Sequence, residues 1–591
     1  MRLAELLIEN YKGIGDEVRI KIDDIVVLIG NNNVGKTTIL SAYEAFAKVK
    51  HILGLTDFHQ EDVTRKPTIT GIFEDVRDGE MTEKWIHKDE NLGYDNCIKV
   101  KYVWNGPGKE KEKYSYNPED KEFIKGGTEG IDTILLSKIP TPIKISPLDQ
   151  PKDLELQVLA ILTEAIKENI KKDANSLSNL IGQIENLAEK VKDEIKDEID
   201  LSTEQVASEL TKVFPELDHI EIDIKSGKIE PEKFINAGSF IRIGNKLGEN
   251  GVLHRAPLQS HGTGLQRTFL WSSLKMLADT GRHKIGRSKL DQDKTKILLI
   301  EEPEAFLHPS AIKEARESLY GIAELANWQV MTTSHSPVFI DLTKNHTTII
   351  RLEKNKTTAH SVKTFSTDEA GFDANDKTNL QMLNFCNPYI NEFFFANEIL
   401  LVEGETEYAT IKHFINEKAI PQSFKIINCI GKANIVTVAK ILNHFKINYS
   451  VLHDADNPTI LRNNRKIRNS AWTNNHKIVD EVRKGIELGL TINKFVSIPN
   501  FEGHYLGGKS GQSKPYEAIT FFQDLINNES AEHFLDLIKY VAGMNETTPG
   551  QLYSDIDTII SRTKLYIDQE GLEEDQKWDV EYYYSDKEKV R

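Results

Sequence analysis

The 591-residue sequence has few cysteines and no long hydrophobic run. Its three cysteines, Cys97, Cys386 and Cys429, are scattered and form no CxxC pair. We therefore expect neither a disulfide framework nor a structural zinc site, in keeping with a reducing compartment. No apolar run approaches the roughly 20 residues that span a bilayer, and the first residues lack the apolar core of a signal peptide. These absences predict a soluble, cytoplasmic protein with no membrane partner.

The sequence also lacks an excess of positive charge. Lys and Arg number 74 against 91 Asp and Glu, so the net charge is −17. This balance argues against a simple basic coat protein for nucleic acid, because phosphate binding depends on Lys and Arg. It leaves room for a local basic groove, or for carboxylates neutralised by metal ions. With 39% apolar and 28% charged residues, the chain is too apolar to be disordered and long enough for several domains.

The periodicity of apolar residues predicts an α/β protein with two domains. Strands and helices alternate over residues 1–353, interrupted at about 152–212 by apolar residues at helical spacing. We interpret this interruption as a helical insert, which is either a hairpin lying on its own domain or a dimerisation arm. The polar segment 354–395 is predicted to be a linker. A second series over 396–591 begins with three short apolar strands, which is typical of a parallel sheet, and ends in a helical extension.

Residues 30–37, GNNNVGKT, fit the pattern GxxxxGK[ST] between an apolar strand and a helix. Backbone N–H groups of such a loop surround phosphates at a helix amino terminus. Lys36 would reach the β- and γ-phosphates and Thr37 would bind Mg²⁺. A chance match is the alternative, which the strand–loop–helix context disfavours. The predicted ATP-binding residues of this loop are Asn32, Asn33, Gly35, Lys36, Thr37 and Thr38.

The apolar run Leu298–Ile300 leads directly into two adjacent acids. At such a strand end, one carboxylate can join the Mg²⁺ shell while the next activates water. We assign Glu301 to the metal, through water, and Glu302 to the general base. Surface acids in salt bridges are the alternative, which the preceding apolar run disfavours.

These elements resemble the ATP-binding-cassette ATPases, in particular the branch that includes RecF, SMC and Rad50. The resemblance covers residues 1–353. Residues 260–266, SHGTGLQ, are similar to the signature loop that contacts a partner's nucleotide, with Ser260, Gly262 and Gly264 as binding residues. His335, in TTSHSP, is similar to the switch histidine beside the γ-phosphate. The resemblance implies at least a dimer, and Gln60 is a candidate for the family's Q-loop residue. Glu301 departs from the Asp that many members carry.

A second set of acids follows two other predicted strands. The run Leu400–Val402 ends at Glu403, and Asp454 and Asp456 follow a strand 51 residues later. Carboxyl ends of parallel strands would bring Glu403, Asp454 and Asp456 together, and the alternation in Asp-Ala-Asp lets two carboxylates converge on one side. Oxygen ligands favour Mg²⁺ or Mn²⁺ over zinc. Two separate acidic turns are the alternative.

This arrangement is similar to the Toprim domain, and an ATPase followed by a Toprim domain resembles the OLD (overcoming lysogenization defect) family of nucleases. That family includes the nuclease subunit of Gabija anti-phage systems. The resemblance implies a two-metal site in which one ion generates the attacking water and the other stabilises the leaving 3′ oxygen. Glu407, with Glu405 as a competitor, and Glu502 would be further metal ligands. Lys514 would stabilise charge on the scissile phosphate.

An 18-residue basic stretch, residues 460–477, follows the second acid pair and contains no acid. Beside a nuclease centre it would bind the DNA backbone, with Trp472 available for stacking on a base. A solvated basic loop is the alternative. The predicted DNA-binding residues are Arg462, Arg465, Lys466, Arg468 and Lys477.

Together the two sites predict a DNA endonuclease that needs Mg²⁺ or Mn²⁺ and is gated by ATP binding or hydrolysis. The alternative is an ATP-dependent DNA-binding repair clamp with an inactive Toprim domain. A topoisomerase or primase is disfavoured, because no zinc-ligand module and little further chain accompany the Toprim pattern. From the resemblance alone we expect a role in anti-phage defence. Its partners would be DNA and further copies of the chain. The sequence does not choose between a helicase-like companion, a retron reverse transcriptase with its RNA–DNA product, and a stand-alone role.

Overall fold

The computed structural model divides into two compact units, residues 1–340 with 346–362, and residues 341–345 with 363–591. Each unit is described by itself. The described residues are 1–76, 81–90, 93–126, 132–145, 196–213, 215, 219–223, 240–247, 252–266, 268–269, 272–273, 284–285, 288–289, 294–354, 360–387, 390–417, 420, 424–463, 465–507, 514–523 and 529–569. Within these ranges no helix combines the length and apolar character that crossing a membrane requires.

The first unit is built on a six-stranded sheet in which five strands are parallel to one another. All residues of its three central strands are buried, as expected where both faces of a parallel sheet are covered. Because the strands are parallel, their carboxyl ends meet at one edge of the sheet. The strand order is β18 (His360–Ser366), β17 (Thr347–Lys354), β3 (Ile25–Gly30), β16 (Trp328–Thr333), β15 (Lys296–Glu301), β9 (Thr141–Ile145).

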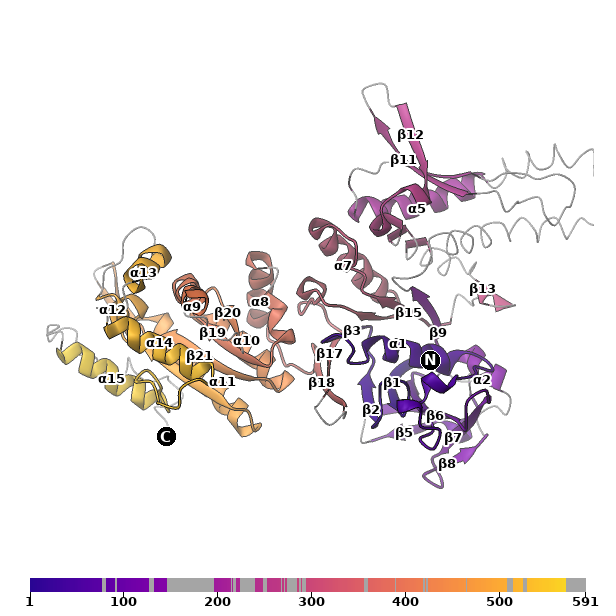
Figure 1. The fold of residues 1–591 in the computed structure, drawn as a ribbon, viewed down its shortest axis with the longest axis horizontal. Helices are drawn as coiled ribbons and strands as arrows, with labels where there is room; N and C mark the ends of the chain where they lie inside the picture. The colour runs from indigo at the N-terminus through magenta and orange to yellow at the C-terminus, as the bar shows by residue number, and fades with distance from the viewer. Residues whose placement is uncertain are drawn as a thin grey trace, which may run out of the picture. The chain divides into compact units, whose positions relative to one another are not determined.

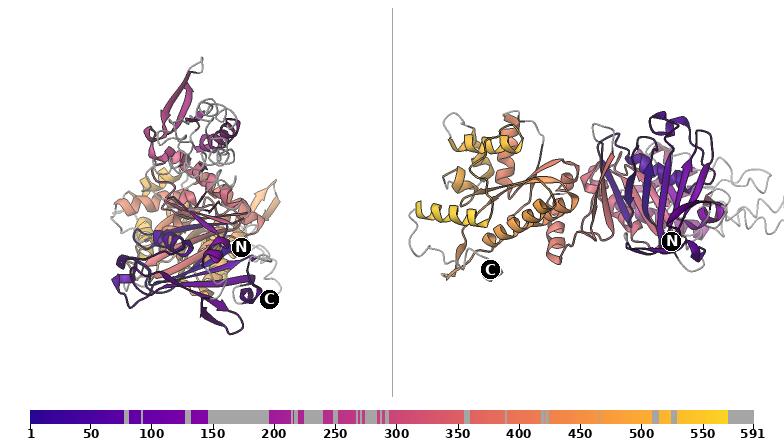
Figure 2. Two further views of the ribbon diagram at one scale, coloured as in Figure 1. Left: turned by 90° about the vertical axis from the view of Figure 1, so that its right-hand side faces the viewer. Right: turned by 90° about the horizontal axis from the view of Figure 1, so that it is seen from below.

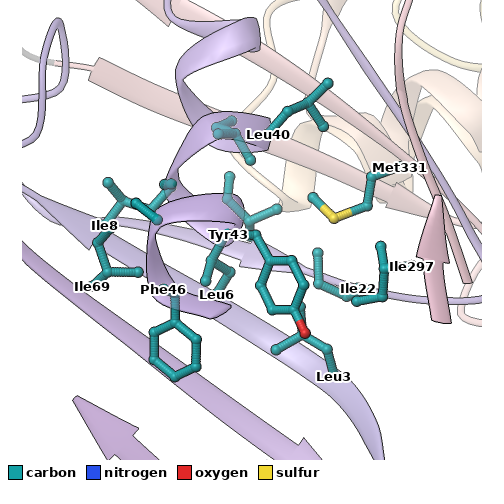
Figure 3. Packing of buried hydrophobic residues seen from close by; sticks show 14 of the residues in the cluster. Leu3, Leu6, Ile8, Ile22, Leu40, Tyr43, Phe46, Ile69, Ile297 and Met331 are labelled. Carbon is teal, nitrogen blue, oxygen red and sulfur yellow. The ribbon is translucent and has the colours of Figure 1, made fainter. Parts of the chain in front are cut away.

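A second, antiparallel sheet completes the core of this unit, and helix α1 (Lys36–Ala47) packs between the two sheets. Figure 3 shows Tyr43 and Phe46 of α1 among side chains from both sheets, including Leu6 and Met331. The strands of the antiparallel sheet lie side by side in the right-hand view of Figure 2. They are β2 (Val18–Lys21), β1 (Arg2–Glu9), β4 (Thr68–Glu74), β6 (Tyr94–Trp104), β7 (Lys111–Asn117) and β8 (Glu122–Lys125), with β5 (His87–Asp89) paired to β6.

Two polar contacts hold α1 in this position. The Tyr43 hydroxyl donates to the Pro140 carbonyl at 2.6 Å. The buried Lys111 ammonium donates to the carbonyls of Ala45 and Phe46 at 3.1 and 2.5 Å. A cation at this end of a helix satisfies carbonyls that have no partner within the helix. These contacts hold the carboxyl-terminal half of α1 in place between the two sheets.

The remaining elements of the first unit include part of the predicted helical insert. Residues 196–212 of that insert lie in helix α5, whereas 151–195 lie outside the described residues. A three-stranded antiparallel sheet follows α5 in the chain. These elements are α2 (Asp132–Lys138), α5 (Lys196–Val213), β10 (His219–Asp223), β11 (Phe240–Leu247), β12 (Val252–Pro257), the pair β13 (Lys284–Ile285) and β14 (Ser288–Lys289), and α7 (Pro309–Ala323).

Residues 354–395, predicted to be a linker, instead contain β18, helix α8 (Ala374–Cys386) and the 3-10 segment Ile390–Phe395. The polar composition was misleading because α8 buries few apolar side chains and is held by polar contacts. Asp376 accepts hydrogen bonds from Thr437 at 3.0 Å and from Lys440 at 2.6 Å, both on α10 (Lys432–Phe445). Helix α8 is therefore part of the second unit.

The second unit is a four-stranded parallel sheet with helices around it (Figure 1). The strand order is β20 (Lys425–Asn428), β19 (Glu398–Val402), β21 (Asn448–Asp454), β24 (Ile492–Ser497). Leu400 and Val402 of β19 and Leu452 of β21 pack with α9 and α14 in one apolar cluster. The helices are α9 (Glu405–Glu417), α10 (Lys432–Phe445), α11 (Ser470–Glu487), α12 (Phe501–Tyr505), α13 (Lys514–Phe522), α14 (Glu529–Val541) and α15 (Ile556–Gln569).

The strand order places a crevice between β19 and β21. The chain runs from β19 to β20 on one side, and then from β20 to β21 on the other side of β19. Connections leaving in opposite directions open a space at the carboxyl ends of two neighbouring strands, where ligands bind in open α/β sheets. Glu403 and Asp454 lie at those two strand ends.

Candidate active sites

The predicted phosphate-binding loop joins β3 to α1 and depends on two glycines. Gly30 and Gly35 have φ values of 139° and 97°, and a Cβ on Gly30 would lie 2.4 Å from the Leu352 carbonyl oxygen. The buried Lys36 ammonium donates to the carbonyls of Gly30 and Asn31, each at 2.9 Å. Burial lowers the Lys36 pKa, while Glu302 and Glu304 oppose that shift. A phosphate is therefore a suitable further partner for this ammonium.

Two predicted catalytic residues lie together at the carboxyl ends of β15 and β16. The Nε2 atom of His335 is 3.8 Å from Oε1 of Glu302. The Glu302 backbone is left-handed, with φ 45°, and its N–H donates to the Thr333 carbonyl at 3.0 Å. Burial lowers the His335 pKa and nearby Lys36 adds to the shift, whereas Glu302 opposes it. Glu302, His335 and Lys36 therefore form one electrostatic site.

Glu301 has a partner that the sequence patterns did not reveal. The Lys144 ammonium, from the neighbouring strand β9, is 3.3 Å from Oε1 of Glu301 and 3.3 Å from Oε2 of Glu44 on α1. Lys144 belongs to no motif, and only the pairing of β15 with β9 brings it beside Glu301. The assignment of Glu301 to a metal ion stays a prediction, and any such ion would share the carboxylate with this lysine.

Glu304, the third acid of the segment 301–304, was also missed. One of its oxygens accepts from the Ser334 hydroxyl at 2.9 Å and from the His335 N–H at 2.7 Å. Burial raises the Glu304 pKa, although the His335 N–H opposes the shift. Its position in Glu-Glu-Pro-Glu was the available signal. Glu304 ties the end of β15 to the His335 loop and so positions the histidine.

The signature-like loop packs against the segment after β15. A Cβ on Gly264 would lie 2.8 Å from the Phe306 carbonyl oxygen, so this position accommodates only glycine without a shift. Ser260 and Gly262 are exposed, as is Gln60. Their predicted roles at a nucleotide stay predictions.

The acids of the second site come from four elements of the second unit: the end of β19, α9, β21 and α12. The Asp454 N–H donates to Oε2 of Glu403 at 3.1 Å across the crevice. Glu407, in the first turn of α9, and Glu502, in the first turn of α12, are buried. Glu405, the alternative to Glu407, is exposed. The structure therefore brings Glu403, Glu407, Asp454 and Glu502 into one region.

The protonation equilibria of these acids show that they repel one another. Burial raises the Glu407 pKa to about 7, with Glu403 and Glu502 adding to the shift. Burial also raises the Asp454 pKa well above its ordinary value, with Glu407 and Glu403 contributing. The Glu403 pKa is raised by burial, which Lys432 opposes. Bound cations would remove this repulsion, as they do for paired carboxylates in general.

Divalent cations fit this donor set, although the set is wider than one ion's shell. The buried Oδ1 atom of Asp454 has no hydrogen-bond partner within the described part of the chain. The one group there whose three ligand atoms all lie within 4.8 Å of one another is elsewhere, at Asp23, Asp24 and His346. In that group Asp24 forms an ion pair with Arg2, which already supplies positive charge. Within the described residues, no three of the second-site acids meet this spacing.

A lysine that the sequence patterns missed completes the second site. The Lys432 ammonium, in the first turn of α10, is 2.8 Å from Oδ2 of Asp456 and 3.1 Å from the Ala455 carbonyl oxygen. The Gly-Lys pair between a strand and a helix was the available signal, as in the phosphate loop. Lys514, which was predicted, is 3.1 Å from Oε1 of Glu502, with 53% of its side chain exposed.

The basic stretch forms a hairpin of β22 (Thr459–Arg462) and β23 (Arg465–Arg468), followed by α11. Arg462 and Lys477 are exposed and Arg468 is half-buried, whereas the side chains of Arg465 and Lys466 lie outside the described set. The predicted stacking role of Trp472 is wrong, because its side chain is fully buried with Ala455 and Val496. Trp472 lies on the buried face of α11, at helical spacing from the buried Asn475 and His476.

Comparisons with known proteins confirm the resemblance and the fold class. A sequence model described as "AAA ATPase domain" matches residues 1–340, and one described as "Overcoming lysogenization defect protein-like, TOPRIM domain" matches residues 394–456. The Old nuclease of Escherichia phage P2 is 23% identical over 479 residues, which is 77% of each chain. Endonuclease GajA of Bacillus cereus (strain VD045) is 24% identical over 433 residues, 71% of this chain and 68% of its own. The Smc head domain of Pyrococcus furiosus has a TM-score of 0.40 at 11% identity, covering 62% of this chain and 97% of that one.

Proposed function

The chain belongs to the AAA ATPase domain family and carries an OLD-like TOPRIM domain, and from this premise we propose that it is an ATP-dependent, metal-dependent DNA endonuclease. The observation that carries the proposal is the convergence of buried, mutually repelling acids at the crevice between β19 and β21. Relatives named as nucleases support the same reaction class. In the first unit, Lys36, Glu302 and His335 supply the groups that ATP hydrolysis requires.

The second-site residues divide into ligands and positioning groups. Glu403 and Asp454 would hold Mg²⁺ or Mn²⁺ at the crevice, with Glu407, Glu502 and Asp456 as further ligands. When bound, such ions supply an activated water and stabilise the leaving 3′ oxygen. Lys432 holds the Asp456 carboxylate. Lys514, which forms an ion pair with Glu502, would stabilise charge on the scissile phosphate.

The exposed cations of the β22–β23 hairpin and α11 provide a place for the DNA backbone. The hairpin is fixed to the acid site at its base, because the Asn469 side chain donates to the Asn457 carbonyl at 2.6 Å. Asn475 on α11 donates to the Ala455 carbonyl at 2.8 Å, inside the Asp-Ala-Asp segment. Phosphates bound at Arg462 or Lys477 would therefore be held in a defined position relative to Asp454.

The deciding experiment is a plasmid-nicking assay with Mg²⁺ or Mn²⁺, with and without ATP. Wild-type protein should nick or cut DNA, and Glu403→Ala and Asp454→Ala should abolish cleavage. Glu405→Ala is the matched control, because Glu405 is an exposed acid only two residues from Glu403. If the protein binds DNA but does not cleave it with any of several divalent metals, the nuclease hypothesis is wrong and the DNA-binding clamp is favoured. If Glu403→Ala and Asp454→Ala cleave DNA as well as wild type, the assignment of the nuclease site is wrong.

We also propose that the protein acts in defence against phage and that its ATPase units associate with one another. Both follow from the family rather than from a measured contact. Phage plating on cells with and without the gene tests the first. Light scattering with and without ATP tests the second, and a monomer in both conditions would contradict it.

A further inference from the structure

Ile430, in the turn from β20 into α10, has a backbone conformation that its residue type disfavours. Its φ is 53°, in the left-handed region that β-branched residues rarely adopt. The turn is fixed by hydrogen bonds on both sides of the residue. The Ile430 N–H donates to the Asn428 side chain at 2.9 Å, and the Asn434 side chain donates to the Ile430 carbonyl at 3.2 Å. A strained residue persists only where its surroundings hold it in this way.

Burial within the chain does not explain the choice of isoleucine at this position. The side chain is 40% exposed, although it follows the buried Cys429. Glycine or asparagine adopts the same backbone conformation at lower cost. Backbone strain of this kind concentrates at active sites and ligand contacts, so the conformation of Ile430 points to a functional role.

The surroundings of Ile430 identify that role. The Cys429 N–H donates to the Val402 carbonyl at 3.0 Å, and the Gly431 N–H donates to the Glu403 carbonyl at 2.8 Å. Lys432, two residues later, holds Asp456. Residues on both sides of Ile430 are therefore bonded to the acid site, which puts the exposed alkyl group at its rim.

We propose that Ile430 is a substrate-contact residue, packing against the deoxyribose or base of a nucleotide beside the scissile phosphate. An alkyl group has no attraction for a metal ion or a phosphate, so its partner must be an apolar part of the DNA. Apolar side chains serve DNA-binding proteins in this way when they press against or between bases. The inference rests on the proposed nuclease function, and it predicts a contact that does not depend on base sequence.

The test combines thermal unfolding with DNA binding by the full-length protein in Ca²⁺, which supports binding without requiring cleavage. The variants are Ile430→Asn, which relieves the backbone strain and removes the alkyl group, and Ile430→Val, which retains a β-branched alkyl group. Leu488→Asn is the matched control. Leu488 is a 55% exposed aliphatic residue with an ordinary φ of −78°, at the end of α11 that precedes the amino end of β24.

Ile430→Asn should raise the unfolding temperature by about 2–4 °C and weaken binding of a DNA duplex about fivefold to tenfold. Ile430→Val should resemble wild type in both measurements, and Leu488→Asn should leave DNA binding unchanged. Unchanged DNA affinity in Ile430→Asn would overturn the proposal. So would a lower unfolding temperature, which would make Ile430 an ordinary packing residue. The two proposals fail in different ways. Wild-type protein that binds no DNA would refute the nuclease function itself, whereas wild-type binding that Ile430→Asn leaves unchanged would refute only the role of Ile430.

Discussion

Replacing Glu407 by glutamine should stabilise the metal-free protein while weakening its response to metal. Glu407 is buried in the first turn of α9. Burial, with Glu403 and Glu502 nearby, raises its pKa to about 7 from an ordinary value of 4.5. Glutamine has nearly the same shape and keeps an oxygen acceptor, but it carries no charge to bury.

The size of the effect follows from the two pKa values. Between pH 4.5 and about 7 the folded protein retains a proton that the unfolded chain has lost, so stability falls as the pH rises through this window. Above that window the cost is constant at about 3 kcal/mol, and below pH 4.5 it disappears. Glu407→Gln should therefore be more stable than wild type by about 3 kcal/mol at pH 8, or about 6–12 °C in unfolding temperature.

The assay is thermal unfolding at pH 5 and pH 8, in EDTA and in Mn²⁺. The increase in unfolding temperature of Glu407→Gln over wild type should be large at pH 8 in EDTA and small at pH 5. Saturating Mn²⁺ should stabilise wild type by about 3 kcal/mol at a hundredfold excess over its Kd, and stabilise the variant less. The exposed neighbour supplies the control, because Glu405→Gln should change neither quantity. A Glu407→Gln protein that is less stable than wild type in EDTA at pH 8 would refute the reasoning.

Three further predictions concern other parts of the two sites. Glu302→Gln should bind ATP but hydrolyse it at least about 100-fold more slowly than wild type, because the general base is lost. Phosphate release measures the hydrolysis, and a nucleotide-binding assay measures the binding. Lys432→Met should destabilise the metal-free protein by about 2 kcal/mol, since Asp456 loses its buried partner, and Mn²⁺ should restore part of that loss; unfolding with and without the ion tests this. Arg462→Ala should weaken DNA binding equally for all sequences and reduce the salt dependence of log K by about one, and a sequence-dependent loss would contradict a backbone contact.

Much of the site could be read from short patterns because their chemistry is local. The loop that begins α1 needs Gly30 and Gly35 for its left-handed turns and Lys36 at the helix start. Acids directly after the buried strands β19 and β21 had to share one edge of the sheet, since parallel strands end together. Glu403 and Asp454 could therefore be paired across 51 residues of sequence.

Other residues escaped detection because their partners are distant in sequence. Lys144 meets Glu301 only through the pairing of β9 with β15, and no spacing rule announces that pairing. Trp472 looked available to DNA in a basic stretch, but the helix turns it inward. The linker prediction failed because hydrogen bonds to Asp376, rather than a long apolar face, join α8 to its unit.

The sequence by itself determined the two-part α/β architecture, the glycine-dependent loop between β3 and α1, and the acids at the strand ends, because each depends on neighbours within a few residues. Tertiary structure alone decided which charges meet. It placed Lys432 against Asp456 and separated the buried Glu407 from the exposed Glu405. The reason is physical: burial and ion pairing depend on how strands and helices pack, and packing joins residues that no local pattern connects.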